Sequence, residues 1–159
     1  MAQYVTAAAG WTPVNHADAA SSLANSSYQA LAAAAASTDR VVEVFIGGEA
    51  TSSTVNRMAL RRCSAQTNTP TNVVPAALNP LSQASAAQGH VLATTGPTIA
   101  STGHLLNLAM NAFGGIIRWV AAPGEEIWIT TATQPNSTVV LDSISGIGTV
   151  SSHIVFEEM

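Results

Sequence analysis

The stretch Arg40–Ile46, with the sequence RVVEVFI, decides the fold class of this chain. Four of its seven residues are β-branched and Gly47-Gly48 follows it, which is typical of a strand with both faces largely covered. Outward from this stretch, the sequence is a succession of short apolar or alternating runs, each closed by Gly, Pro, Asn or Ser. This succession predicts an all-β fold, either an antiparallel sandwich or a barrel.

The next run toward the C-terminus, Val55–Ser64, alternates between apolar and polar residues. A strand over these residues points Met58 and Leu60 to one face and Arg57 and Arg61 to the other. The first pair is therefore expected in the core. Further strands are expected at His90–Thr95, His104–Met110, Gly115–Ala121, Glu125–Thr131, Thr138–Asp142 and Val150–Glu157.

The sequence IIRWVAAPGEEIWIT, which begins at residue 116, predicts a hairpin. Pro123-Gly124 is the residue pair that suits the two central positions of a type II turn. Alternation after this turn predicts that Ile127 and Ile129 face inward and that Trp128 lies on the opposite face.

Three segments are less regular within the single domain predicted for residues 1–159. Residues 1–20 suggest a strand followed by an extended N-terminal arm. The alanine-rich residues 28–36 fit either a strand, which the all-β context favours, or a short helix, which alanine favours intrinsically. Three prolines interrupt Thr67–Gln88 (residues 67–88), and because proline supplies no donor to a β-ladder we expect a long loop or arm there.

The chain carries few charges, 9% of its residues against about 25% in an ordinary domain. It has no lysine, and its net charge is −4. Binding to nucleic acid or to an acidic membrane through basic residues is therefore not expected. Charged side chains are also depleted at the centres of protein interfaces, so this composition suits a surface that other proteins cover.

No motif points to chemistry, so no catalytic residue, metal site or cofactor is predicted. Cys63 is the only cysteine, and no two histidines stand at a spacing that places both on one metal. No G-x-S-x-G motif occurs, and Glu125-Glu126 would point to opposite faces of a strand. No cationic residue precedes Arg40 and no apolar run approaches 18 residues, so neither a secretory signal nor a membrane span is expected.

The candidate binding surface is a cluster of arginines. Arg57, Arg61 and Arg62 lie within six residues of one another, and their forked donors suit carboxylates on a neighbouring subunit. The alternative is that they are simply solvated surface charges. Trp128 completes the candidate interface as an aromatic residue on the outward face of its strand.

The order of these features resembles small structural proteins of tailed bacteriophages, the head cement or decoration proteins. The resemblance rests on RVVEVFIGGEA (40–50), STVNRMALRRCS (53–64), TPTNVVPAALNP (69–80), IIRWVAAPGEEIWI (116–129) and SSHIVFEEM (151–159). It implies a jelly-roll-like sandwich that assembles as a trimer in the virion and bridges capsomers by binding the major capsid protein. It implies no catalytic residues.

Other functions stay open at this stage. A tail, baseplate or fibre component belongs to the same class of virion protein. A carbohydrate-binding jelly roll would use Trp11, Trp119 and Trp128 as a stacking platform for sugar rings. An enzyme of the cupin kind ranks last, because it requires a metal-binding histidine cluster that the sequence does not contain.

Overall fold

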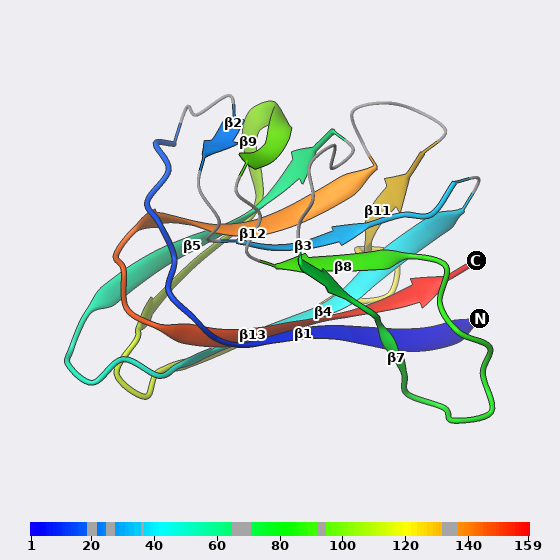
Figure 1. The fold of residues 1–159 in the computed structure, drawn as a ribbon, viewed down its shortest axis with the longest axis horizontal. Helices are drawn as coiled ribbons and strands as arrows, with labels where there is room; N and C mark the ends of the chain where they lie inside the picture. The colour runs from blue at the N-terminus through cyan, green and yellow to red at the C-terminus, as the bar shows by residue number, and fades with distance from the viewer. Residues whose placement is uncertain (19–21, 25–27, 36, 65–70, 92–94, 132–136) are drawn as a thin grey trace.

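The computed structural model describes residues 1–159 except 19–21, 25–27, 36, 65–70, 92–94 and 132–136. Every regular element in the described residues is a β-strand, and the strands form two antiparallel sheets packed face to face (Figure 1). The predicted all-β antiparallel sandwich is therefore confirmed.

The sheet called A here contains six strands: β1 (Ala2–Trp11), β4 (Thr38–Gly48), β7 (Ala76–Ala77), β10 (Ile116–Val120), β11 (Ile127–Thr130) and β13 (Val150–Glu158). Their spatial order is β10-β4-β13-β1-β7, and β11 also pairs with β4. Because β1 and β13 are neighbours, the two chain termini lie side by side at one end of the sandwich (Figure 1).

The sheet called B contains seven strands: β2 (Ser22–Ala24), β3 (Gln29–Ala32), β5 (Val55–Cys63), β6 (Thr71–Val73), β8 (Gln88–Val91), β9 (Thr95–Asn111) and β12 (Thr138–Ser145). Their order is β2-β9-β5-β12-β3-β8-β6. The expected strands around residues 40–46, 55–64, 104–110, 138–142 and 150–157 are therefore confirmed.

The main core lies between the two sheets. Met58 and Leu60 of β5 are fully buried there, as the alternation predicted. They face β4, from which Val41, Val44 and Ile46 point inward. Burying side chains of this size stabilises the fold by about 1.5–3 kcal/mol each.

A buried polar chain also links the two sheets. Gln29 of sheet B donates from Nε2 to the carbonyl oxygen of Thr6 in sheet A, at 2.9 Å. Ser152 Oγ donates to Gln29 Oε1 at 2.6 Å, and Trp11 Nε1 donates to Ser152 Oγ at 2.9 Å. Leaving a buried polar atom without a hydrogen-bond partner costs free energy of folding. These hydrogen bonds between Gln29, Thr6, Ser152 and Trp11 therefore fix how the two sheets lie against each other.

Strand β4 contains a bulge that strict alternation does not foresee. Its register with β13 pairs Val155 with Glu43 and Phe156 with Val41, which leaves Val42 without an opposite residue. The extra residue turns Glu43 to the outer face while the apolar residues on both sides of the bulge stay inside. The sequence predicted that both faces of this strand are largely covered. The inner face is buried, but the outer face is only partly buried.

The predicted hairpin at residues 116–130 is wrong, although its turn is right. Glu125 N donates to Ala122 O at 2.9 Å and Gly124 has φ +89°, which is the type II geometry expected of Pro123-Gly124. However, β10 and β11 both pair antiparallel with β4, one after the other along the same edge. A type II turn splays the strands that flank it, so it suits this short excursion better than a tight hairpin.

The alanine-rich segment forms a strand over Gln29–Ala32, as the all-β context favoured. Strand β3 pairs with β12 on one side and β8 on the other. Ladder bonds on both edges outweigh the weak helical preference of alanine, which is a few tenths of a kcal/mol per residue.

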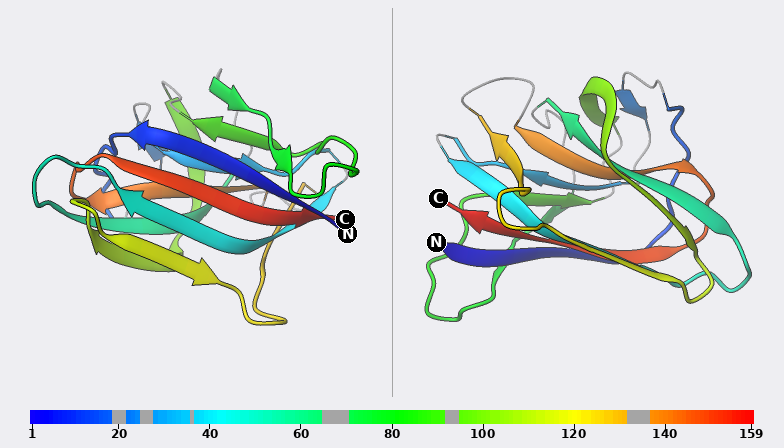
Figure 2. Two further views of the ribbon diagram at one scale, coloured as in Figure 1. Left: turned by 90° about the horizontal axis from the view of Figure 1, so that it is seen from below. Right: turned by 180° about the vertical axis from the view of Figure 1, so that it is seen from behind.

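Neither predicted arm is free over the described residues. Strand β1 lies between β13 and β7, and the chain after it crosses to sheet B, where His16 N donates to Ser143 O at 2.8 Å. In the second segment, β6 pairs with β8 in sheet B and β7 pairs with β1 in sheet A, so Thr71–Ala77 steps from one sheet to the other (Figure 2). Residues 67–70 of that prediction lie outside the described residues.

One carboxylate is buried at the end of the sandwich where the termini lie. Asp39 of β4 is fully buried, and its register partner on β13 is Glu158. Burial, followed by the nearby charge of Glu158, raises the pKa of Asp39 to about 7.

Replacing Asp39 tests the cost of this burial. The folded state holds the Asp39 proton more tightly than the unfolded state, whose ordinary pKa is 3.8, so this group lowers the free energy of unfolding as pH rises from about 4 to about 7. We expect Asp39→Asn to melt at a higher temperature than the wild type at about pH 8, with the difference vanishing near pH 4.

Thermal melts followed by circular dichroism across this pH range measure the effect. Glu125→Gln, which removes an exposed carboxylate, is the control and leaves the melting curve unchanged. A wild-type protein that is as stable as Asp39→Asn at pH 8 contradicts the prediction.

Candidate functional site

The outer face of sheet B is covered by other parts of the chain, whereas the outer face of sheet A is not covered by any described segment. After β1 the chain rises along the outer face of sheet B and adds β2 at its edge (Figure 1). A second apolar cluster fills the space beneath it, formed by Leu23, Tyr28, Ala30, Cys63, Ile99 and Val140. The outer face of sheet A has no such layer over it in the described residues (Figure 2, left).

A buried ion pair lies beneath the segment that covers sheet B. Arg61 of β5 and Asp142 of β12 are both fully buried, with Nε and Oδ1 3.2 Å apart. Arg61 Nη1 donates to the carbonyl oxygen of Asp18 at 3.1 Å, and His16 Nδ1 lies 3.6 Å from Asp142 Oδ2. Burial raises the pKa of Asp142 to about 6, against the opposing effect of the Arg61 charge. The pair therefore ties the N-terminal segment to two central strands.

The predicted arginine cluster is divided by this arrangement. Arg57 and Arg61 do share one face of β5 with Arg62 opposite, as predicted, and Arg57 is exposed. The expectation that Arg61 contacts a neighbouring subunit is wrong, because its side chain has no exposed surface and pairs with Asp142 inside the chain. Sequence spacing could not show that residues 15–18 cover this face.

Arg62 and Trp128 are in contact, but their side chains do not form one exposed interface as predicted. Arg62 Nη1 donates to the carbonyl oxygen of Trp128, so this arginine bridges the two sheets, and its burial lowers its pKa. Trp128 is 41% exposed, and its ring centroid lies 5.9 Å from the guanidinium carbon of Arg40. Ile127 and Ile129 are buried on the other side, as the alternation predicted.

The outer face of sheet A carries a compact charged group at its centre. Glu43 Oε2 accepts a hydrogen bond from Arg118 Nη2 at 2.7 Å, and Glu43 Oε1 lies 3.1 Å from His153 Nε2. The hydrogen bond from Arg118 is the main cause that lowers the pKa of Glu43. The His153 ring stacks on Phe45, with the centroids 4.8 Å apart.

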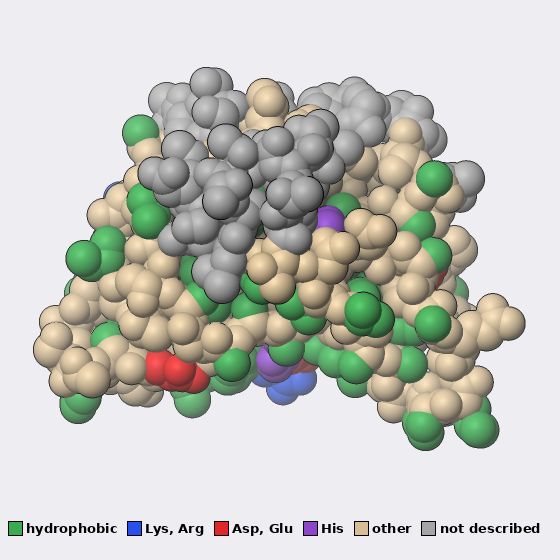
Figure 3. All heavy atoms as spheres, viewed as in Figure 1, with side chains coloured by type: hydrophobic (Ala, Val, Ile, Leu, Met, Phe, Trp, Pro, Cys, Tyr) green, Lys and Arg blue, Asp and Glu red, His purple; other side chains and the backbone are tan. Residues whose placement is uncertain are grey.

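A second charged group lies along the same face. Arg40 pairs with Glu157, and Gln3 Nε2 donates to Glu157 Oε1 at 2.9 Å. These contacts, the one from Gln3 first, lower the pKa of Glu157. Between the two groups the face is formed by Val5 and Val155, which are register partners, while Ala7 lies opposite His153 and Ala9 follows it along β1. Figure 3 shows a few charged and histidine side chains along this lower surface, set among hydrophobic and neutral ones.

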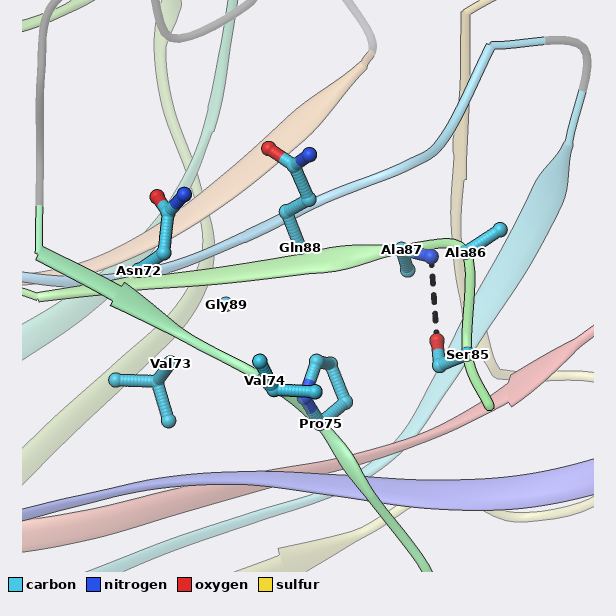
Figure 4. A pocket seen from close by; sticks show the side chains of 9 residues that line it. All are labelled: Asn72, Val73, Val74, Pro75, Ser85, Ala86, Ala87, Gln88 and Gly89. Carbon is cyan, nitrogen blue, oxygen red and sulfur yellow. Dashed lines mark hydrogen bonds between the residues drawn. The ribbon is translucent and has the colours of Figure 1, made fainter. Parts of the chain in front are cut away.

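The best-defined pocket on the described surface contains no ionisable or metal-binding side chain. A pocket of about 220 Å³ lies between residues 72–75 and 85–89 (Figure 4). Its lining contains no charged group, and Ser85 Oγ already accepts a hydrogen bond from Ala87 N at 3.2 Å. In the described part of the chain, no three His, Cys, Asp or Glu side chains are placed to hold a metal ion. Nor is any helix there long and apolar enough to cross a membrane.

The three tryptophans do not form a sugar-stacking platform. Trp11 is buried in the core, where its Nε1 is bonded to Ser152. Trp119 packs against the core from the inner face of β10, and only Trp128 lies on the outer face of sheet A.

Sequence reasoning missed the charged groups on sheet A. Alternation in SSHIVFEEM does place His153 away from Ile154 and Phe156, which the structure confirms. The partner of His153, however, is Glu43 on β4, and only the pairing of β13 with β4 and the bulge in β4 bring the two together.

Removing one member of the buried ion pair should be costly. Arg61→Met leaves Asp142 as a buried carboxylate without its cation, so we expect the free energy of unfolding to fall by about 3–5 kcal/mol. The double variant Arg61→Met/Asp142→Leu should recover most of this loss, because neither charge then stays buried. Urea titrations measure both values.

Arg57→Met, on the same strand but exposed, is the matched control and should change stability by no more than about 0.5 kcal/mol. If Arg61→Met is as stable as Arg57→Met, the ion pair does not hold the N-terminal segment in place.

No family model, curated protein or solved structure matches this chain. We therefore infer its function from the geometry of its surfaces.

Proposed function

We propose that this chain is a structural protein of a tailed-bacteriophage virion, a jelly-roll-like cement protein that binds the major capsid protein and bridges capsomers. The order of elements from Arg40 onward, which resembles such proteins, supports this function. The observation that carries the proposal is the uncovered, charge-compensated outer face of sheet A.

Charge compensation matters because an interface must lose its water. Covering an unpaired charge costs several kcal/mol, whereas a carboxylate that already accepts hydrogen bonds loses much less. On this face Glu43 is held by Arg118 and His153, and Glu157 by Arg40. A partner protein can therefore cover the face without supplying new counter-charges.

The small side chains of the face favour close approach. Ala7 and Ala9 are exposed on β1 and present little more than backbone to a partner. A flat surface of this kind fits the regular lattice of a shell, where each copy adds modest contacts that multiply over many sites.

A second proposed contact with the shell lies at the end of the sandwich where the two termini are. The loop after β7 carries Leu78 and Leu81, and Leu81 is 91% exposed. A hollow of about 370 Å³ separates this loop from Met1 and Gln3. Exposed leucines in a loop that both sheets anchor suit insertion between neighbouring capsomers.

A tail, baseplate or fibre role belongs to the same class and uses the same face. A carbohydrate-binding role has weaker support, because the three tryptophans lie on different surfaces. The trimer that the resemblance implies stays a prediction, which the solution mass of the protein decides.

Binding to shells tests the proposal. The probe is an undecorated shell assembled from the major capsid protein of the phage that encodes the chain. Ala7→Glu adds a carboxylate to the outer face of sheet A opposite His153, whose Nε2 already contacts Glu43, so we expect the amount that co-sediments with the shells to fall at least tenfold.

Ser52→Glu is the matched control, since it adds the same charge at an exposed turn away from that face and should bind like the wild type. Both variants should melt within a few degrees of the wild type. Equal binding by Ala7→Glu and Ser52→Glu rules out this face as the contact, and a wild-type protein that binds no shell rules out the cement function.

A further inference from the structure

Strand β10 is an edge strand whose outer backbone groups meet no other described strand (Figure 2, left). Its bonds to β4 fix which groups these are. Gly48 N donates to Gly115 O at 2.8 Å, and Ala121 N donates to Val42 O at 2.9 Å. Because an antiparallel ladder alternates, the odd-numbered residues of β10 point their N–H and C=O groups toward β4.

The even-numbered residues therefore turn their backbone groups to the open edge. These are Ile116, Arg118 and Val120, each with one donor and one acceptor free to pair with a further strand. Edge strands usually carry lysine, proline or inward-pointing charges that prevent such pairing. Here Ile116 and Val120 are 69% and 54% exposed, and the one charge, Arg118, is paired with Glu43.

We propose that β10 pairs antiparallel with β10 of a second copy of this chain, about a two-fold axis at Trp119. The pairing joins the two A sheets into one continuous sheet. It exchanges at least four backbone hydrogen bonds, because Arg118 of each copy lies opposite Val120 of the other. The same edge serves both copies, as a two-fold interface requires.

Three registers give at least four backbone hydrogen bonds within β10, with the axis at Ile117, Arg118 or Trp119, and charge selects the last of them. An axis at Arg118 would set two arginines directly opposite each other, which is unfavourable. An axis at Ile117 would set Arg118 opposite Ile116, whose neighbour on β4 is Gly47.

With the axis at Trp119, Arg118 of the second copy lies opposite Val120, and the neighbour of Val120 on β4 is Glu43. The long arginine side chain can cross Val120 and reach that carboxylate, once in each direction. The two Trp119 side chains also meet at a closely spaced, non-hydrogen-bonded position, where aromatic pairs stabilise antiparallel strands.

The interface is small, so the dimer should depend on concentration. A strand of five residues supplies fewer hydrogen bonds than the roughly ten of a typical interface. The inference does not rest on the cement function, since it concerns contact between copies and not between the chain and a shell. It predicts a dimer where the resemblance implies a trimer, so the solution mass decides between the two.

Cysteine cross-linking tests the register. At the axis, the two Cα atoms of residue 119 lie about 4.5 Å apart, within the range that a disulfide spans. We expect Trp119→Cys to form a covalent dimer under mild oxidation. Ile117→Cys is the control and should stay monomeric, because the two copies of residue 117 are on the order of 13 Å apart along the strands. The native Cys63 does not compete, since it is buried and its pKa is raised to about 12.

Proline substitution tests the hydrogen bonds. Val120→Pro removes an outward N–H and leaves the bonds to β4 in place, so we expect the dissociation constant of the dimer to rise at least tenfold in sedimentation equilibrium. Val120→Ala keeps the N–H and should stay within about threefold of the wild type.

A wild-type protein that is monomeric at every concentration overturns the proposal, as does a trimer. Cross-linking of Ile117→Cys in place of Trp119→Cys overturns the register. None of these outcomes bears on whether the protein binds shells.

Discussion

The pairing of β4 with three other strands is the constraint on which the rest of the structure depends. Over its eleven residues β4 pairs with β13 along one edge and with β10 and then β11 along the other. It supplies inward apolar residues to the core and outward charged residues to the surface. The bulge at Val42 makes this division possible, because one extra residue shifts the alternation between the two halves of the strand.

A second constraint decides which surface of the sandwich is left uncovered. The ion pair of Arg61 and Asp142 lies on the outer face of sheet B and is bonded to the chain that crosses it. Buried ion pairs contribute little net stability, yet breaking one is costly, so they act mainly to specify one arrangement. Here the arrangement covers sheet B, and no described segment lies over the outer face of sheet A.

Sheet A has two surfaces that no described segment covers, namely its outer face and its β10 edge. Its outer face is flat and its charges are paired within the chain, which suits a protein partner. Its β10 edge has open backbone groups, which suit another strand. Arg118 takes part in both, since it holds Glu43 on the face and stands on the edge strand.

The sequence by itself determined the fold class, because β-branched runs closed by Gly and Pro leave few alternatives to an antiparallel sandwich. It also determined local geometry: the inward side of Val55–Ser64, the type II turn at Pro123-Gly124 and the outward side of Trp128 each follow from alternation or from backbone preference. These features depend on neighbours within a few residues.

Only the tertiary structure decided which strands pair, and with that the surfaces. The chain after β1 buries Arg61, β10 and β11 share β4 instead of forming a hairpin, and Glu43 meets His153 from a strand about a hundred residues away. Each of these depends on register between distant strands. Alternation specifies which way a side chain points within a strand, but not which strand or segment lies opposite it.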